Sequence, residues 1–429
     1  MRSSRAGGAL VLVACTAAVA LPACGSSSDG GGSGAAKKPG GPVTLTWWHN
    51  GNTDPLKKVW EGVAADFHRA HPNVTIKVQP LQNEQFQTKM PLALRSSSPP
   101  DIYQQWGGGN QASQLRSGKV MDLTQAVSGW IKDLGAAAQG WQTNGRQYGV
   151  PYDLHVVGFW YRKDLFAKAG ISSPPTTMDE LNADVAKLKA KSIAPIAIGS
   201  KDRWPDAFWW EYFAVRECAT DTLKTAMANI DFSDPCFVKA GDDLKAFLAT
   251  KPFQTGYLGT PAQQGASSSA GLVANGKAAM ELQGDWNPGE MAALTDDKKF
   301  REKLGWFPFP SVPGGKGDEG VALGGGDGFS CTTKATSACV EFLKFIAGPD
   351  VQKRLLQAGA AVVPANPEAA SVVTDPTIKT VLDYSKQAPY IQTYFDIALP
   401  TATGQTLDDA VASFFAKPGA SASIPSSVK

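Results

Sequence analysis

The chain has 429 residues, a formal net charge of +2 and only 19% charged residues. A charge this close to zero gives no electrostatic case for nucleic-acid binding. At about 150 residues per domain, the length predicts two or three domains.

The first residues have the pattern of an export signal. Arg2 and Arg5 precede an apolar run over residues 6–20, which is shorter than the roughly 20 residues that a membrane span needs. We therefore place a secretory signal peptide at residues 1–23. Ala23 directly before Cys24 resembles the lipobox of bacterial lipoproteins, in which the cysteine becomes the lipid-modified first residue. An ordinary cleaved signal is the alternative.

Residues 24–42 are rich in Gly and Ser and have no apolar face to bury, which predicts a flexible tether. Four cysteines follow it, and an even number in an exported chain indicates disulfides. Proximity favours Cys218–Cys236 and Cys331–Cys339, although the sequence alone permits three pairings. Neither pair has the short spacing of a zinc site, so we expect no metal.

The tethered part begins with alternating strands and helices. Strands are predicted at residues 43–48, 74–78 and 101–103, separated by helices at 55–70 and 86–94. Asp54 is expected to cap the first helix, with Pro55 at its first position. This order is the start of an open parallel α/β sheet, in which ligands bind beyond the carboxyl ends of the strands.

Polar side chains follow two of these strand ends. They are His49 and Asn50 after the first strand, and Gln105 and Trp106 after the third. Amide side chains donate and accept hydrogen bonds at once, which matches a ligand hydroxyl. Loop capping is the alternative for the amides, and His49 could equally bond the backbone.

A second lobe is predicted after residues 148–161, a segment that looks like a crossing. Asp153 in this segment could accept two ligand hydroxyls in charge-assisted hydrogen bonds, or cap the hinge instead. Thr177 and Glu180 form a capping box at the start of a helix. Trp204 precedes an aromatic-rich helix and is followed by a proline, which favours an exposed position. Most aromatic residues over 208–213 are assigned to the core.

Trp286 lies at the exit of a short strand predicted over residues 278–282. The turn pair Gly284-Asp285 precedes it, and Asn287-Pro288 is expected to break the chain again. A large flat ring flanked by an acid and an amide suits a sugar, which has apolar C–H faces and a rim of hydroxyls. The alternative is that the ring only plugs the surface of a lobe.

A glycine-rich run over residues 321–328 is predicted to cross back to the first lobe. Asp327 lies among glycines that let a backbone and a ligand approach closely, so Gly325, Gly326 and Asp327 are candidate binding residues. No helix opening with Lys-Ser/Thr follows, which excludes a nucleotide loop. Residues 362–364 cross once more, and repeated crossings imply a hinge.

The order and spacing of several short motifs resemble family 1 of the extracellular solute-binding proteins, the carbohydrate receptors of ABC importers. The motifs lie at residues 45–49, 99–102, 149–151, 161–166, 175–181, 276–286 and 341–345, with Gln352 and Pro364 beyond the last. Met178 stands where the family usually has Trp. Residues 105–109 and 324–328 are most similar to receptors for xylobiose and related short oligosaccharides.

The resemblance implies an α/β fold of two lobes that close on the ligand as a clamshell, in which open sheets are flanked by helices and a hinge joins the lobes. We place the N-terminal lobe at residues 43–150 and 320–350 and the C-terminal lobe at 151–319 and 351–429. The resemblance also implies a monomeric protein that needs no cofactor. Such a protein is anchored by a lipid at the outer face of the cell membrane and presents an oligosaccharide to ABC permease subunits.

Two alternatives remain open at this point. A secreted glycoside hydrolase would need two carboxylates roughly 5 to 10 Å apart, for which Asp153, Asp285 and Asp327 are candidates. A receptor for a solute other than a sugar is the second alternative. The sequence contains no G-x-S-x-G, H-E-x-x-H or P-loop motif.

Overall fold

The computed structural model describes residues 41–428, which belong to one compact unit. The predicted signal peptide, Cys24 and nearly all of the tether lie outside the described residues. Among the helices of residues 41–428, none combines the length and the apolar character that crossing a membrane requires.

A mixed β-sheet runs through this unit. Its strands, in the order in which they lie side by side, are β2 (Val74–Pro80), β1 (Val43–His49), β3 (Ile102–Gln105), β10 (Ala322–Cys331), β6 (Val150–Arg162), β8 (Ala278–Gly284) and β7 (Ala194–Ala197). Shorter strands pair at its sides or form a separate hairpin: β9 (Leu304–Phe307) and β11 (Val363–Pro364) on β6, β12 (Ile391–Thr393) on β10, and β4 (Gln142–Thr143) with β5 (Arg146–Gln147).

Helices cover the faces of the sheet. They are α1 (Leu56–Ala70), α2 (Asn83–Arg95), α3 (Gly108–Leu115), α4 (Thr124–Val127), α5 (Lys163–Lys168), α6 (Met178–Ala190), α7 (Trp204–Glu217), α8 (Thr220–Asn229), α9 (Pro235–Ala249), α10 (Ser269–Ala274), α11 (Asn287–Ala293), α12 (Phe300–Lys303), α13 (Ser337–Ala347), α14 (Pro349–Ala358), α15 (Pro376–Gln387), α16 (Phe395–Ala398) and α17 (Thr401–Ala416). Short 3₁₀ helices lie at Ile131–Trp141, Ser200–Asp202, Tyr257–Gly259, Pro367–Val372, Ser421–Ser423 and Pro425–Ser427.

The first three strands are parallel, as the sequence predicts. β1 pairs with β2 on one side and with β3 on the other, and both pairings are parallel. Along β1 the side chains of Leu45, Trp47 and His49 are buried and alternate with more exposed neighbours. The carboxyl ends of β1, β2 and β3 therefore meet at one edge of the sheet.

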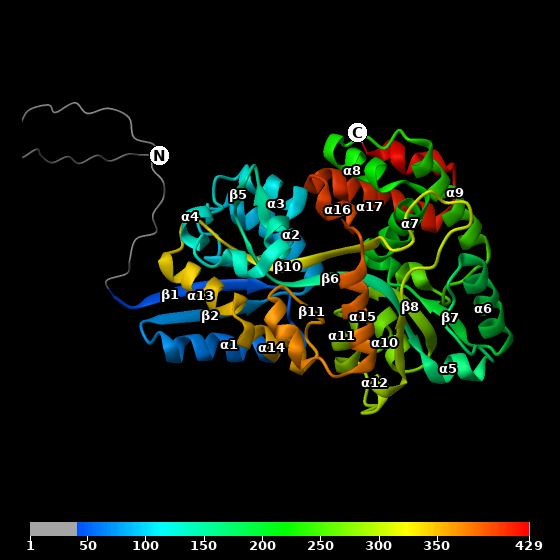
Figure 1. The fold of residues 1–429 in the computed structure, drawn as a ribbon, viewed down its shortest axis with the longest axis horizontal. Coiled ribbons are helices and arrows are strands. Elements are labelled where there is room, and N and C mark those ends of the chain that lie inside the picture. The colour runs from blue at the N-terminus through cyan, green and yellow to red at the C-terminus, as the bar shows by residue number, and fades with distance from the viewer. Residues whose placement is uncertain (1–40, 429) are drawn as a thin grey trace, which may run out of the picture. The chain divides into compact units, whose positions relative to one another are not determined.

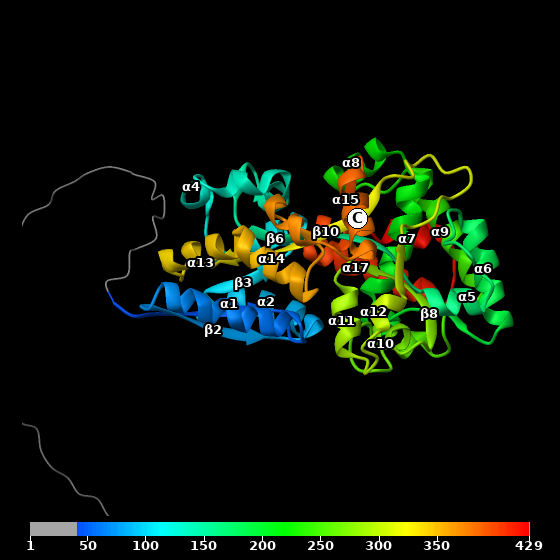
Figure 2. The same ribbon diagram turned by 60° about the horizontal axis from the view of Figure 1, so that its bottom comes forward.

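The long strands β6 and β10 connect two groups of elements. The first half of β6 pairs antiparallel with β10, with Asp153 opposite Asp327, whereas its second half pairs with β8 and β9 around Phe159. Figure 1 shows α1, α13 and α14 beside β1 and β2 on one side of these strands, and α5 to α7 beside β7 and β8 on the other; the turned view of Figure 2 shows the same helices beside β2 and β8.

Each group has its own apolar core. One core contains Trp47, Trp60, Phe342 and Leu355 from β1, α1, α13 and α14. Another packs aromatic and aliphatic side chains of β6, α6, α7, α9 and β9 together. Leu355 thus places α14 beside α1, whereas the sequence assigned residues from 351 onward to the C-terminal lobe. The division into lobes stays a prediction.

Two local predictions are confirmed. Thr177 and Glu180 form the capping box at the start of α6. The disulfides join Cys218 to Cys236 and Cys331 to Cys339, the pairings that proximity favours.

Two other local predictions are wrong. Asp54 does not cap α1, because the helix begins at Leu56 and Pro55, expected at its first position, is the residue directly before it; the carboxylate of Asp54 forms an ion pair with Lys58 at 2.5 Å. Asn287-Pro288 does not break the chain but begins α11, because a proline tolerates the first turn of a helix, where its missing N–H has no partner to lose.

Candidate functional site

A cavity lies at the carboxyl ends of β1, β2 and β3 and faces side chains from β6, α7, α11 and α16. We call it the central cavity and define it by the side chains that line it: Asn50, Asn52, Thr53, Leu56, Gln82, Asn83, Gln87, Trp106, His155, Trp204, Phe208, Gln263, Gln264, Trp286, Glu290, Asp327, Tyr394, Asp396 and Ile397. Five of the predicted binding residues are therefore brought together, namely Asn50, Trp106, Trp204, Trp286 and Asp327.

One wall of the central cavity follows from the parallel strands. Asn50 follows β1, Asn83 begins α2 directly after β2, and Trp106 follows β3. The side-chain amide of Asn50 donates to Oδ1 of Asn83 at 3.1 Å, so the two amides hold each other in place. Trp106 packs edge-on against Phe86 of α2, with ring centroids 5.5 Å apart. This wall offers amides and one indole.

Aromatic rings form the facing wall. Trp286 contacts His155 edge-on at a centroid distance of 4.8 Å, and its ring stands perpendicular to that of Tyr394 at 6.4 Å. Phe208 links Trp204 to Tyr394, with centroid distances of 5.4 and 5.2 Å. The aromatic rings thus support one another and present a continuous apolar surface with polar edges.

Gly284 explains how Trp286 reaches this position. A Cβ atom at residue 284 would lie 2.0 Å from the indole ring, so the ring folds back over the end of β8 where only a glycine leaves room. Substitution of Gly284 would displace the ring. The sequence pair Gly284 and Trp286 is therefore one structural unit.

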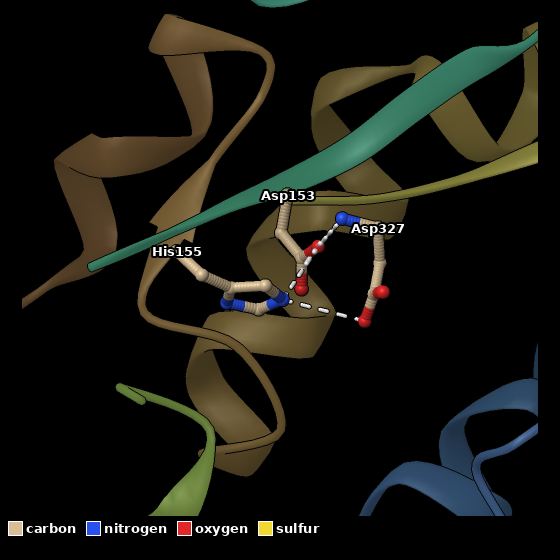
Figure 3. Close-up of side chains that lie close together, drawn as sticks. All are labelled: Asp153, His155 and Asp327. Carbon is tan, nitrogen blue, oxygen red and sulfur yellow. Dashed lines mark hydrogen bonds and ion pairs between the residues drawn. The ribbon is translucent and has the colours of Figure 1, made fainter. Parts of the chain in front are cut away.

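A buried group of charged residues lies at the base of the central cavity, which we call the acid–histidine cluster: Asp153, His155, Asp285 and Asp327. Figure 3 shows Asp153 and His155 on one strand and Asp327 on its neighbour, with the imidazole directed at both carboxylates. His155 Nδ1 lies 2.7 Å from Asp285 Oδ1. Its Nε2 lies 3.3 Å from Asp327 Oδ2 and 3.4 Å from Asp153 Oδ1.

The charges of the acid–histidine cluster depend on one another. Burial alone would lower the pKa of His155, but the carboxylates of Asp153 and Asp285 raise it well above its usual range. Burial raises the pKa of Asp153 well above its usual range, and Asp327 and Asp285 raise it further against the attraction of His155. The cluster thus favours the charged form of the imidazole and disfavours the charged form of Asp153.

Hydrogen bonds connect this cluster to the wall of amides. The side-chain amide of Gln104 donates to Asp327 Oδ1 at 2.9 Å, and its oxygen accepts from the backbone N–H of Asn50 at 3.0 Å. The hydroxyl of Tyr152 donates to Asp327 Oδ2 at 3.1 Å. Asp327 is thus fixed from three sides while its side chain keeps 15% of its surface exposed toward the cavity.

Two further carboxyl groups line the central cavity. Both oxygens of Glu290 accept from the hydroxyl of Thr53, at 3.1 and 3.0 Å, which joins α11 to the segment before α1. Burial raises the pKa of Glu290 to about 7 and that of Asp396 to about 6. Near neutral pH these groups exchange between hydrogen-bond donor and acceptor.

Asp153, His155 and Asp327 are also a set of donors that could hold a metal ion, since their ligand atoms lie within 4.8 Å of one another. A nitrogen and two carboxylates are ligands that zinc accepts. In the described chain these atoms already contact one another in ion pairs, as Figure 3 shows.

Two predicted binding residues serve their own loops instead. Gln105 is fully buried, and its side-chain oxygen accepts from the backbone N–H groups of Trp106 and Gly107 at 2.7 and 2.9 Å. His49 is also fully buried, where its Nδ1 accepts from the N–H of Gly51 at 3.1 Å. Burial lowers the pKa of His49 to about 3, so it stays neutral. Neither lines the central cavity.

The other three predicted binding residues, Asp153, Gly325 and Gly326, lie behind the wall of the central cavity. Asp153 is 2% exposed and accepts from the N–H of Asp327 at 3.1 Å, so it supports the wall without lining it. A Cβ at Gly325 would meet the ring of Tyr394, and one at Gly326 would meet the backbone of Asp153. These glycines allow neighbouring parts of the protein, rather than a ligand, to approach β10.

Several lining residues escaped the sequence analysis. His155 shares a strand face with Asp153, two residues earlier, so the strand period alone could have indicated it. Asn83 follows a strand end, by the same rule that found Asn50. Asp396 carries no local signal, because its position depends on the packing of α16 against distant elements.

Comparisons with known proteins agree with this architecture. A family model described as bacterial extracellular solute-binding protein matches residues 50–353. An uncharacterized ABC transporter extracellular-binding protein of Pyrococcus horikoshii is 26% identical over 316 residues, which cover 71% of this chain and 67% of that protein. The diacetylchitobiose binding protein of Streptomyces coelicolor is 25% identical over 350 residues, covering 80% and 78% of the two chains.

A solved structure extends the similarity over nearly the whole chain. It comes from work on xylan utilization by the thermophilic bacterium Caldanaerobius polysaccharolyticus and superposes with a TM-score of 0.82 at 25% identity, covering 90% of this chain and 99% of that one. The predicted α/β class with a large sheet flanked by helices is confirmed.

Proposed function

Because the chain belongs to the bacterial extracellular solute-binding proteins, we propose that it is the binding component of an ABC sugar importer. It captures a short oligosaccharide in the central cavity and presents it to permease subunits in the membrane. Members of this family bind a solute and catalyse no reaction, so the chain is a binding protein and not an enzyme.

The observation that carries this proposal is the pairing of two walls across one cavity. Asn50, Asn83 and Trp106 lie on one side, and Trp204 and Trp286 lie on the other. A sugar ring has apolar C–H faces that stack on indoles and hydroxyls that exchange hydrogen bonds with amides and carboxylates. The walls match both parts of such a ligand.

Unpaired polar atoms support a hydroxylated ligand. The hydroxyl of Tyr394 and Oδ2 of Asp285 are buried and have no hydrogen-bond partner within residues 41–428. A buried polar group without a partner costs about 1–3 kcal/mol. Tyr394 lines the central cavity, and a ligand hydroxyl would satisfy it.

For the ligand itself we propose xylobiose or a related short β-linked oligosaccharide. The similarity to a structure from work on xylan utilization supports this choice, as does the glycine-rich pattern of residues 324–328. The relative from Streptomyces coelicolor is named for binding diacetylchitobiose, another disaccharide. Contacts with rings on both walls favour an oligosaccharide over a single sugar.

For its location we propose the outer face of the cell membrane. Residues 1–23 act as a signal peptide, a lipid on Cys24 anchors the chain, and residues 24–42 form the tether. The chain acts as a monomer, since one copy holds both walls of the cavity. Loss of membrane association in a Cys24→Ala variant of the full-length precursor, measured by cell fractionation, tests the anchor.

Thermal-shift measurements with mono- and oligosaccharides test the binding proposal. Xylobiose, xylotriose, cellobiose, xylose and glucose are each added to the protein at increasing concentration. A ligand at 100 times its Kd stabilises the fold by about 2.7 kcal/mol. We expect a rise in Tm with a β-linked oligosaccharide and little change with the monosaccharides. Equal shifts for free xylose and glucose would contradict the oligosaccharide assignment.

A further inference from the structure

The titratable groups that line the central cavity are mostly carboxyl groups. Besides Tyr394 they are Glu290, Asp327, Asp396 and His155, and neither a lysine nor an arginine is among the described residues that line it. Arg203, directly before Trp204, forms an ion pair with Asp409 on α17. The imidazole of His155 is therefore the cation that the described lining contributes.

The imidazole of His155 is surrounded by more carboxyl groups than it can neutralise. His155 contacts three carboxyl groups, those of Asp153, Asp285 and Asp327. Asp285 is 1% exposed, and its Oδ2 has no hydrogen-bond partner within the described residues. Three carboxyl groups thus share one imidazole, and no lysine or arginine of the described residues forms an ion pair with any of them.

The other two carboxyl groups have no cation beside them. Glu290 is held by the hydroxyl of Thr53, and burial is the main influence on its ionisation. Asp396 is buried likewise and is stabilised only by backbone N–H groups. Ionising either carboxyl thus places a charge in a poorly solvated site whose cost no positive group of the described residues offsets.

We infer that the central cavity selects saccharides by their charge: it binds a saccharide that carries a protonated amine more tightly than the neutral parent and rejects one that carries a carboxylate. The inference rests on the proposed function and names the class of saccharide within it. Amine-bearing and neutral oligosaccharides are ligands, and uronic acids are excluded.

Both halves of this selectivity follow from the same groups. An ammonium donates charge-assisted hydrogen bonds to the oxygens of Glu290, Asp327 or Asp396 and is attracted to the faces of Trp204 and Trp286. A carboxylate meets like charges and the negative faces of the rings. His155 cannot serve it, because Asp285 and Asp327 already engage the two ring nitrogens.

Three disaccharides on one skeleton test the inference. They are cellobiose, 6-amino-6-deoxycellobiose and cellobiouronic acid, which differ only in the group at C6. Calorimetric titration of the full chain at pH 7 and low salt is expected to give a Kd about tenfold lower for the amine and at least about tenfold higher for the acid. Raising the salt concentration should narrow both ratios.

Variants identify the groups responsible. Glu290→Gln and Asp396→Asn each replace a carboxyl group by an amide of nearly the same shape that cannot ionise, and each should reduce the ratio of amine to neutral affinity severalfold. Glu319→Gln removes an exposed charge outside the cavity and should leave the ratio unchanged. Far-ultraviolet circular dichroism and Tm confirm that each variant is folded.

The outcomes separate this inference from the proposed function. A uronic acid bound as tightly as cellobiose, or an amine that brings no gain over it, overturns the charge selectivity while leaving oligosaccharide binding intact. Xylotriose serves as the neutral ligand for the function itself. If xylotriose, xylobiose and cellobiose all fail to bind, the proposed function fails, whatever the charged sugars do.

Discussion

The indole of Trp286 is expected to carry a large share of the affinity for an oligosaccharide. The ring lies over Gly284, stands at steep angles to the rings of His155 and Tyr394 and lines the central cavity, so we expect one of its faces to be open to a ligand. Replacing Trp286 by Ala removes this face and leaves the amides of the opposite wall in place. The variant should therefore lose stacking without losing the hydrogen bonds of Asn50.

The size of the loss follows from the area involved. A tryptophan side chain buries about 150–250 Å² when fully covered, and one free face is roughly 80 Å² of that. At about 25 cal/mol per Å² the lost contact is worth about 2 kcal/mol, which is about a 30-fold increase in Kd. Trp286→Phe keeps a smaller ring and should lose about half of this free energy.

Calorimetric titration with xylotriose measures the effect, with Trp130→Ala as the matched control. Trp130 is also partly buried but lies outside the central cavity, so its replacement should leave Kd within about twofold. The Tm of each variant without ligand reports any loss of folding. A folded Trp286→Ala variant that binds xylotriose as tightly as the parent would refute the assignment of this ring to the ligand.

Four further predictions concern stability and ions. Burial raises the pKa of Glu281 to about 7, so this group stabilises the fold fully below about pH 4.5 and loses its contribution as the pH rises through 7. Glu281→Gln should therefore reduce the change in the free energy of urea unfolding between pH 4 and 8 by up to about 3 kcal/mol. An unchanged pH dependence would contradict the raised pKa. His155→Gln leaves buried carboxylates without their cation and should lower the free energy of unfolding by about 3–5 kcal/mol. Adding Asp285→Asn to the same chain should restore part of this loss. No recovery in the double variant would argue against an interaction between His155 and Asp285. Cys218→Ser with Cys236→Ser opens a loop of 18 residues and should cost about 3 kcal/mol in chemical unfolding, and an unchanged midpoint would show that the bridge adds nothing. EDTA should leave the affinity for xylotriose unchanged, because the donor atoms of Asp153 and Asp327 already contact His155. Affinity lost on chelation and restored by zinc would show that the cluster holds an ion.

The sequence predicted those parts of the site that depend on local pattern. The ends of β1, β3 and β8 are readable from alternation and from Gly, Asn and Pro, and the rule that ligands bind beyond strand ends then pointed to Asn50, Trp106 and Trp286. Cys218–Cys236 could be paired because its partners are close in sequence. The same local reasoning gave the capping box of α6.

The sequence could not predict which way a side chain turns at a strand end. Gln105 and Trp106 follow the same strand, yet the amide of Gln105 accepts hydrogen bonds from its own loop and Trp106 alone faces the cavity. The acid–histidine cluster was also beyond reach, because it requires the register that sets Asp327 opposite Asp153. Asp153 and Asp327 are 174 residues apart, and a register between strands so distant in sequence leaves no mark in a local pattern.

Amide hydrogen exchange with and without saturating xylotriose tests most directly whether the central cavity holds the saccharide. We expect slower exchange over residues 50–56 and 82–87 on one wall and over 286–290 and 394–397 on the other. The account would be contradicted if calorimetry shows that xylotriose is bound but amide exchange stays unchanged in both walls, because the sugar would then occupy a different site.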